Sequence, residues 1–155
     1  MISNEDIYKK YMSDLKQRIL DSYHQSGKEA TGKFAEEIEE EVDGNHMKLW
    51  GAPHSYFMEK GRGPGGWPPR KAIEEWIDKK PGLPSIFREK KNQFVYLISR
   101  KIAREGTKGG DVLEHVIQEW VEKDFWIMIK ELRGEYAVRI QNDVVNLIRT
   151  FSKAS

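Results

Sequence analysis

Apolar and polar positions at the start of the chain alternate with the period of an α-helix. The apolar residues recur three or four positions apart: Ile7, Tyr8, Tyr11, Met12, Leu15, Ile19, Leu20 and Tyr23. This spacing predicts an amphipathic helix over Asn4–Gln25. Ser3, followed three residues later by Asp6, is typical of a capped helix start, and Gly27 is typical of a helix end.

The next segment has a pattern that fits two structures. Its apolar residues are four positions apart: Phe34, Ile38 and Val42. This spacing fits one face of a helix and also one side of a strand. Three features favour strands: a break at Thr31-Gly32, a turn signal at Asp43-Gly44-Asn45, and alternation in the five residues that follow. We therefore predict a hairpin of Lys33–Val42 and His46–Trp50.

A loop rich in glycine and proline follows a predicted short third strand, His54–Lys60. The stretch Tyr56–Trp76 contains four glycines and three prolines. Glycine tolerates positive φ and proline fixes φ near −65°, so the loop is either a flexible connector or a shaped surface held against a partner. Predicted elements flank it closely, which favours the shaped surface. We expect Trp76 in the core, whereas Trp67 fits a loop staple and a partner contact equally well.

The rest of the chain has a largely helical pattern. We predict helices over Lys71–Lys79 and Ile86–Arg104, a hinge at Thr107–Gly110, and helical structure from Asp111 onwards. The dense apolar run Phe125–Ile129 fits either a strand or a buried helical turn. A long helical stripe then reaches the C-terminal end: Leu132, Tyr136, Ile140, Val144, Leu147, Ile148 and Phe151.

These elements predict an α+β fold: a small antiparallel sheet, formed by the hairpin and the short strand, packed by several helices with a long C-terminal helix. The 155 residues and 18.1 kDa fit one domain. Its parts are an N-terminal helix (4–25), the sheet with the glycine-proline loop (31–70) and a helical part (71–152).

The net charge of +1 conceals two blocks of opposite sign. Phe34–Asp43 holds six acids and no base, and Ser85–Lys108 holds seven bases against two acids. Such segregation suits complementary contacts between copies of one protein, whereas a general nucleic-acid binder is usually basic overall. The candidate charged interface residues are Glu36, Glu39, Glu41, Arg100, Lys101 and Arg104.

The sequence lacks cysteine, which excludes disulfides and thiolate metal sites. Its apolar runs are far shorter than a membrane span, and no N-terminal signal sequence is present. We therefore expect a protein that folds in a cytoplasm-like compartment without membrane contact.

We find no sequence pattern for catalysis. A phosphate loop and a zinc-binding helix motif are absent, and the four histidines share no metal-ligand spacing. The string Gly61–Gly66 superficially resembles a phosphate loop but lacks the adjacent lysine and contains a proline. Glu36–Glu41 with Glu59 and Lys60 lacks a recognised nuclease order. We predict no catalytic residues, no metal ligands and no cofactor.

A series of short motifs has an informative order. They are Thr31-Gly32, Asp43-Gly44, Gly51-Ala52-Pro53, Glu59, the run GRGPG from Gly61, Pro68-Pro69, Ile73, Trp76-Ile77, the run YLISRKIAR from Tyr96, and Glu105-Gly106-Thr107-Lys108. This order resembles the tail-completion, or head-to-tail joining, proteins of tailed bacteriophages. The resemblance covers about half of the chain, and it ends after Lys108, where a tryptophan-containing helical region follows instead of a short proline- and phenylalanine-bearing segment.

The resemblance implies a structural virion protein. Such proteins form homo-oligomeric rings in the neck, between the portal or adaptor and the tail, and double-stranded DNA passes through the lumen without sequence recognition. They are assembled in the host cytoplasm and have no enzymatic activity. Opposite charge blocks suit the head-to-tail contacts of a ring. The expected interface residues around the loop are Tyr56, Glu59, Arg62, Pro64, Trp67 and Arg70.

Two alternatives come from other classes of function. The first is a nucleic-acid-binding protein, or a nuclease, of a mobile element, which would bind phosphates through Arg100, Lys101 and Arg104. The second is a small regulatory module of the toxin-antitoxin type. Neighbouring portal, capsid and tail genes would distinguish a neck protein from both.

Overall fold

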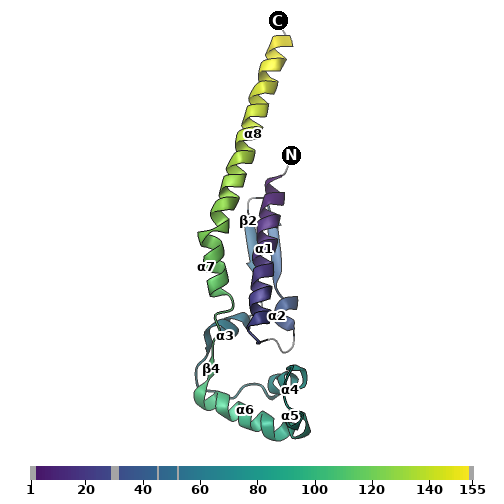
Figure 1. The fold of residues 1–155 in the computed structure, drawn as a ribbon, viewed down its shortest axis with the longest axis vertical. Coiled ribbons are helices and arrows are strands. Elements are labelled where there is room, and N and C mark those ends of the chain that lie inside the picture. Colours follow the sequence, from purple (N-terminus) through teal and green to yellow (C-terminus); the bar gives the residue numbers. More distant parts are fainter. Residues whose placement is uncertain (1–2, 29–31, 45, 52, 154–155) are drawn as a thin grey trace.

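The protein is elongated in the computed structural model, which describes residues 3–28, 32–44, 46–51 and 53–153, with side chains described as far as residue 145. Figure 1 shows α1 (Asn4–Gln25), the hairpin, α7 (Glu114–Glu122) and the first part of α8 (Asp124–Lys153) packed side by side, while α4 (Arg70–Lys79), α5 (Ile86–Glu89) and α6 (Lys91–Glu105) gather at the opposite end. The C-terminal half of α8 projects beyond the N-terminal end of α1 (Figure 1).

Helix α1 spans Asn4–Gln25, as its apolar periodicity predicts. The Ser3 hydroxyl accepts a hydrogen bond from the backbone of Asp6 at 3.1 Å, and the Asp6 carboxylate accepts one from the backbone of Ser3 at 2.9 Å. This reciprocal cap satisfies two backbone donors that the first helical turn leaves unpaired. After the helix, Gly27 adopts a φ of 66°.

The hairpin is confirmed, although its first strand is shorter than predicted. Strand β1, Glu39–Asp43, pairs antiparallel with β2, His46–Trp50. Met47 and Leu49 face the core and the other β2 side chains face solvent, as the alternation predicts.

The predicted strand start at Lys33 is wrong, because α2 occupies Lys33–Glu36. Phe34 and Ile38 are 2% and 4% exposed, so their four-residue spacing puts both side chains into the same core through a helical turn. Of the motif residues, Thr31, Asn45 and Ala52 lie outside the described part of the chain.

The predicted third strand His54–Lys60 is also wrong. This segment contains α3, Ser55–Lys60, in which the buried Ser55 and the core-packed Met58 are three positions apart. The extended residues come directly afterwards: β3, Gly61–Arg62, pairs antiparallel with β4, Thr107–Lys108. The predicted hinge at Thr107–Gly110 therefore contains a strand of a second two-stranded sheet.

The remaining elements are helical. Helix α4 spans Arg70–Lys79, and the single helix predicted over Ile86–Arg104 is divided into α5, Ile86–Glu89, and α6, Lys91–Glu105. Lys90 interrupts them with φ −109° and ψ 39°, outside the helical region.

The C-terminal region consists of α7, Glu114–Glu122, and α8, Asp124–Lys153. The run Phe125–Ile129, which fits a strand or a helical turn in the sequence, lies within α8. The two sheets and the surrounding helices place the protein in the predicted α+β class.

The buried side chains form two separate clusters. The larger core joins α1, α2, α7 and α8 with the segments beside them: Ile7, Tyr11, Leu15, Ile19, Tyr23, Phe34, Ile38, Val112, Val116, Trp120, Met128 and Leu132. The smaller core contains Ile73, Ile77 and Val95, surrounded by partly buried residues of α4, α5 and α6. Trp76 packs at the edge of this smaller core and is half-buried.

Polar contacts fasten α8 to α1 beside the larger core. The Arg18 guanidinium contacts the Asp124 carboxylate at 2.9 Å, and Lys10 contacts Glu131 at 3.0 Å. The Tyr11 hydroxyl donates to the same Glu131 carboxylate at 2.8 Å. Burial and this hydrogen bond raise the pKa of Tyr11 to about 12, so the hydroxyl remains a donor at neutral pH.

Candidate interface on helix α6 and the glycine-proline loop

A close approach of two backbones positions the glycine-proline loop. Gly61 in β3 has a φ of 78°, and an added Cβ would overlap with the carbonyl oxygen of Thr107. Gly106 has a φ of 73°, and a Cβ there would overlap with the carbonyl oxygen of Arg62. Only glycine fits both the left-handed backbone and the lack of space. These glycines therefore fix where the loop leaves the sheet.

Glu59, in the last turn of α3 next to this joint, binds the start of α7. Its carboxylate accepts backbone hydrogen bonds from Val112 at 2.8 Å, Leu113 at 2.9 Å and Glu114 at 2.9 Å, at the N-terminal end of α7. Burial alone would raise the pKa of Glu59, but the three backbone donors outweigh it and lower the pKa below its ordinary value. The side chain thus acts within the chain, as a cap for α7.

The loop itself is held against α6. The backbone of Gly65 donates to the carbonyl of Ala103 at 2.9 Å, and the Arg62 guanidinium donates to the carbonyl of Gly66. The Trp67 ring packs on Tyr96, with 5.6 Å between the ring centroids. Trp67 nevertheless remains 55% exposed. The loop is a surface shaped by these contacts, with more than half of the Trp67 side chain exposed to solvent.

Helix α6 continues this surface with apolar and basic side chains. Tyr96 and Leu97 are 54% and 52% exposed, and Arg100, Lys101 and Arg104 are exposed next to them. Positions three and four apart share a helix face, so Leu97 lies in line with Arg100 and Arg104. We call the exposed side chains Trp67, Tyr96, Leu97, Arg100, Lys101 and Arg104 the α6 face.

The bases of the α6 face have no acidic partner among the residues that the structure describes. Elsewhere exposed lysines reach carboxylates, as in Lys91–Asp78 at 2.6 Å and Lys48–Glu41 at 3.2 Å. Unpaired guanidinium and ammonium groups beside exposed aromatic rings are suited to an acidic partner, because arginine and aromatic residues are favoured anchors of interfaces.

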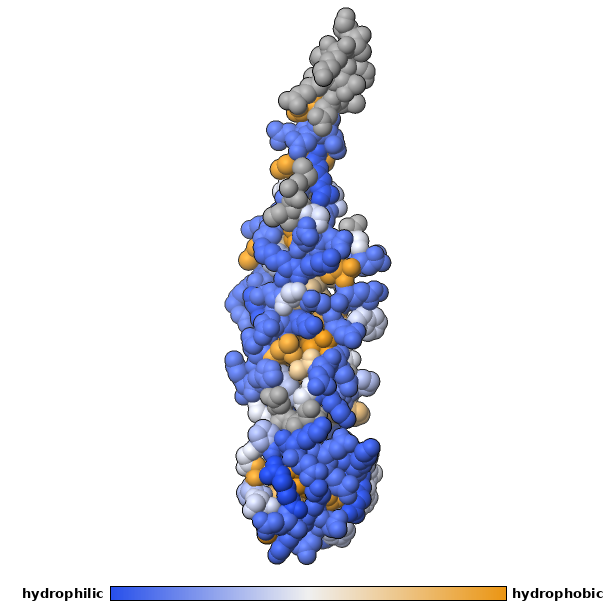
Figure 2. Space-filling model, turned by 90° about the vertical axis from the view of Figure 1, so that its right-hand side faces the viewer, coloured by the Kyte–Doolittle hydropathy of each residue, from blue (hydrophilic) through white to orange (hydrophobic). Residues whose placement is uncertain are grey.

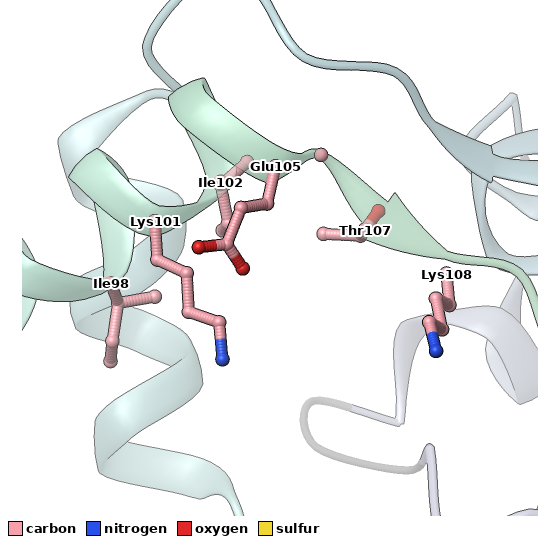
Figure 3. A pocket seen from close by; sticks show the side chains of 7 residues that line it. Ile98, Lys101, Ile102, Glu105, Thr107 and Lys108 are labelled. Atoms are coloured by element: carbon pink, nitrogen blue, oxygen red, sulfur yellow. The ribbon is translucent and has the colours of Figure 1, made fainter.

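A pocket of about 540 Å³ opens beside the α6 face (Figure 3). Ile98 and Ile102 supply apolar lining, while Lys101, Glu105 and Lys108 supply charged groups. Figure 3 shows Lys108 across the pocket from Lys101 and Glu105. This mixture suits an apolar side chain with an acidic group near it. The lining has no nucleophile paired with a base, which is the arrangement that covalent catalysis requires.

The structure brings together one part of the predicted interface. Arg62, Pro64 and Trp67 lie in the loop held against α6, which carries Arg100, Lys101 and Arg104. Arg70 also reaches this helix, since its guanidinium contacts Asn92 at 2.5 Å as well as Glu74 at 2.7 Å.

Other predicted interface residues lie elsewhere. Tyr56 is 66% exposed on α3, and Glu59 points to α7. Glu36 is exposed on α2, which lies near α4, and Glu39 and Glu41 are exposed on β1, in the hairpin beside α1 and away from α6 (Figure 1). Glu41 accepts hydrogen bonds from the Trp50 indole at 3.1 Å and from Lys48 at 3.2 Å, which lower its pKa.

The sequence interpretation missed Tyr96 and Leu97 as interface candidates. The signal that would have found them is their position on the predicted helix, since Phe94, Val95, Ile98 and Ile102 already fill its apolar face. Adjacent apolar residues on the opposite side of an amphipathic helix require a second explanation.

Within the described part of the chain, no group of three or more acidic or histidine side chains is placed to hold a metal ion. None of the described helices has the length and hydropathy that crossing a membrane requires. Comparisons with protein-family models, curated proteins and solved structures give no match to this chain.

Proposed function

We propose that the chain is a structural protein of the head-tail connector of a tailed bacteriophage. In this role copies form a ring between the portal or adaptor and the tail, inside the virion neck, and DNA passes through the lumen. The ordered motifs of the sequence support this proposal, and two of their glycines, Gly61 and Gly106, lie at the β3–β4 joint.

The observation that carries the proposal is the α6 face. It is exposed, basic and partly aromatic, and its shape depends on the glycine-proline loop. An acidic surface, Glu39 and Glu41 of the hairpin, lies on a different part of the same chain. Two complementary surfaces in different places make a heterologous contact, which closes into a ring when the rotation between subunits allows it. We therefore assign the subunit contact to these surfaces.

The first experiment tests whether Trp67 serves assembly. The protein is mixed with the portal-adaptor particles and tails encoded by the same genome, and joined particles are counted by electron microscopy. Trp67→Ala is expected to abolish joining, whereas Trp67→Phe keeps an aromatic ring on Tyr96 and retains most of it. Normal thermal unfolding of both variants excludes misfolding. Full joining by folded Trp67→Ala would argue against the proposed contact.

The second experiment tests the pairing of charges. Reversing two bases, Arg100→Glu with Arg104→Glu, is expected to stop ring formation, and adding Glu39→Arg with Glu41→Arg in the same chain is expected to restore it. Lys71→Glu with Lys79→Glu is the matched control, because both lysines are exposed on α4. Failure of the second pair to rescue assembly would assign the acidic partner to another protein.

A second candidate function is nucleic-acid binding, which the unpaired bases beside Trp67 and Tyr96 favour. It predicts that affinity for duplex or single-stranded DNA falls steeply with salt and is lost in the Arg100→Glu, Arg104→Glu variant. Strong binding at low salt by a chain that never joins heads and tails would replace the connector proposal. Absence of binding at low salt would remove this candidate.

A further inference from the structure

The projecting part of α8 carries apolar side chains that the rest of the described chain does not cover. They are Tyr136, Val138, Ile140, Val144 and Val145, which are between 38% and 62% exposed. Figure 2 shows hydrophobic positions interrupting the hydrophilic surface along this projection. A helix segment without tertiary contacts is marginally stable in water, and its apolar stripe requires a partner.

Four exposed residues of α8 have the spacing of a coiled-coil seam. Arg133, Tyr136, Ile140 and Asp143 are separated by three, four and three positions, while Ile129, four positions before Arg133, is partly buried against the larger core. This alternation keeps the residues on one side of a helix and presents them to a facing helix. Arg133 and Asp143 are both exposed, so two opposite charges flank the apolar pair Tyr136 and Ile140.

The charges of this seam match those of a second copy when the two helices run antiparallel. When two α8 helices run antiparallel and cross level with Val138, Arg133 of each copy faces Asp143 of the other. In the same register Tyr136 faces Ile140 twice. A parallel pair in register places Arg133 against Arg133 and Asp143 against Asp143, which is repulsive. Polar residues within a seam specify register and orientation in this way.

We propose that two copies of this chain associate through an antiparallel pair of α8 helices, centred on Val138. The contact is isologous, because the same surface serves in both copies. It differs from the heterologous contacts of the proposed ring and does not depend on them. The proposed dimer is that of the free protein in solution, before it binds other neck proteins.

Sedimentation equilibrium of the full chain measures the association. Arg133→Glu places a negative charge opposite Asp143 of the other copy, and Asp143→Arg places a positive charge opposite Arg133. Each variant is therefore expected to weaken the dimer about tenfold or more. The double variant Arg133→Glu, Asp143→Arg exchanges both charges and is expected to restore the dimer. Lys130→Glu is the matched control, since Lys130 is exposed on α8 about 100° around the helix from Ile129.

A spin-label measurement tests the orientation. The chain lacks cysteine, so Lys130→Cys gives one labelling position per copy. An antiparallel pair centred on Val138 separates the two labels by about 24 Å along the helix axis, at 1.5 Å per residue. A parallel pair holds them about 10 Å apart. A short distance, a monomeric wild type at high concentration, or a double variant as weak as the single ones would each overturn the proposal.

Discussion

The two hydrophobic cores differ in size and in how they are held. The larger core extends along α1, α7 and α8 and contains twelve buried side chains among the residues that the structure describes. The smaller core, inside residues 63–106, contains three. None of the buried or partly buried members of one cluster belongs to the other.

The difference in core size means that contacts outside the smaller core must stabilise that part of the chain. Three buried aliphatic side chains contribute little of the free energy that orders a segment of this length. The smaller part is therefore expected to depend on the β3–β4 ladder, on the glycines within it and on Glu59 beside it. The α6 face, which carries the proposed function, lies in the part that is expected to be less stable.

The sharpest test of this comparison removes one buried isoleucine from each core. Ile19 and Ile77 are 1% and 0% exposed, so Ile19→Ala and Ile77→Ala each remove similar buried volume and cost about 2 to 5 kcal/mol. Amide hydrogen exchange is expected to show that Ile77→Ala accelerates exchange in α4 and α6 while α1 stays protected. Ile19→Ala accelerates exchange throughout. Equal acceleration everywhere in both variants would mean that the cores unfold together.

The second test breaks the joint between the two parts. Gly106→Ala adds a Cβ that overlaps with the Arg62 carbonyl in a backbone of positive φ, and is expected to lower the free energy of unfolding by about 3 kcal/mol. Gly27→Ala is the control, because its φ is also positive but its Cβ meets nothing within 4 Å. The control is expected to cost about 1 kcal/mol. Urea unfolding of both variants measures the difference, and equal costs would refute the steric argument.

The third test removes the charge that caps α7. Glu59→Gln is expected to cost roughly 1 to 3 kcal/mol at neutral pH, since the carboxylate accepts three backbone hydrogen bonds. The folded-state pKa of Glu59 is lowered, so its contribution is complete above the unfolded-state pKa and is lost as the pH falls through the folded-state value. Wild type should therefore lose more stability than Glu59→Gln as the pH falls below the ordinary pKa of a glutamate side chain. Parallel pH profiles would contradict this role.

The smallest effect is expected from the ion pair that joins the two parts across their surface. The Lys33 ammonium lies 3.4 Å from the Glu75 carboxylate, and both side chains are substantially exposed. Glu75→Gln should change the free energy of unfolding by less than about 1 kcal/mol, and less at high salt. Chemical unfolding at two salt concentrations measures this. A larger loss would show that surface charge contributes to holding the smaller part in place.

Elements set by local signals are those that the sequence predicts well. The Ser3–Asp6 cap, the helix that follows it and the alternation in β2 each depend on residues a few positions apart. The first strand is misplaced because a four-residue spacing fits both structures, and the burial of Phe34 together with Ile38 decides between them only in the folded chain.

The candidate interface is predictable only in part. The unusual loop and the basic block are visible in the sequence, but their contact through Trp67 and Tyr96 is a tertiary interaction. The strand pairing of Arg62 with Thr107 and the reach of Glu59 to α7 also join distant segments. The Glu59 side chain caps α7 and so has a role within the chain. No other sequence pattern supports its predicted place in an interface.

The register of β3 and β4 has a consequence for engineering the chain. Arg62 pairs directly with Thr107, so residues 63–106 leave and re-enter the molecule at neighbouring points. A two-residue Asn-Gly turn in place of that segment would close the ladder as an ordinary hairpin. The larger core would lose none of its members. Residues 63–106, which contain α4, α5 and α6, are therefore an insert that another domain could replace while the helices of the larger core stay the same.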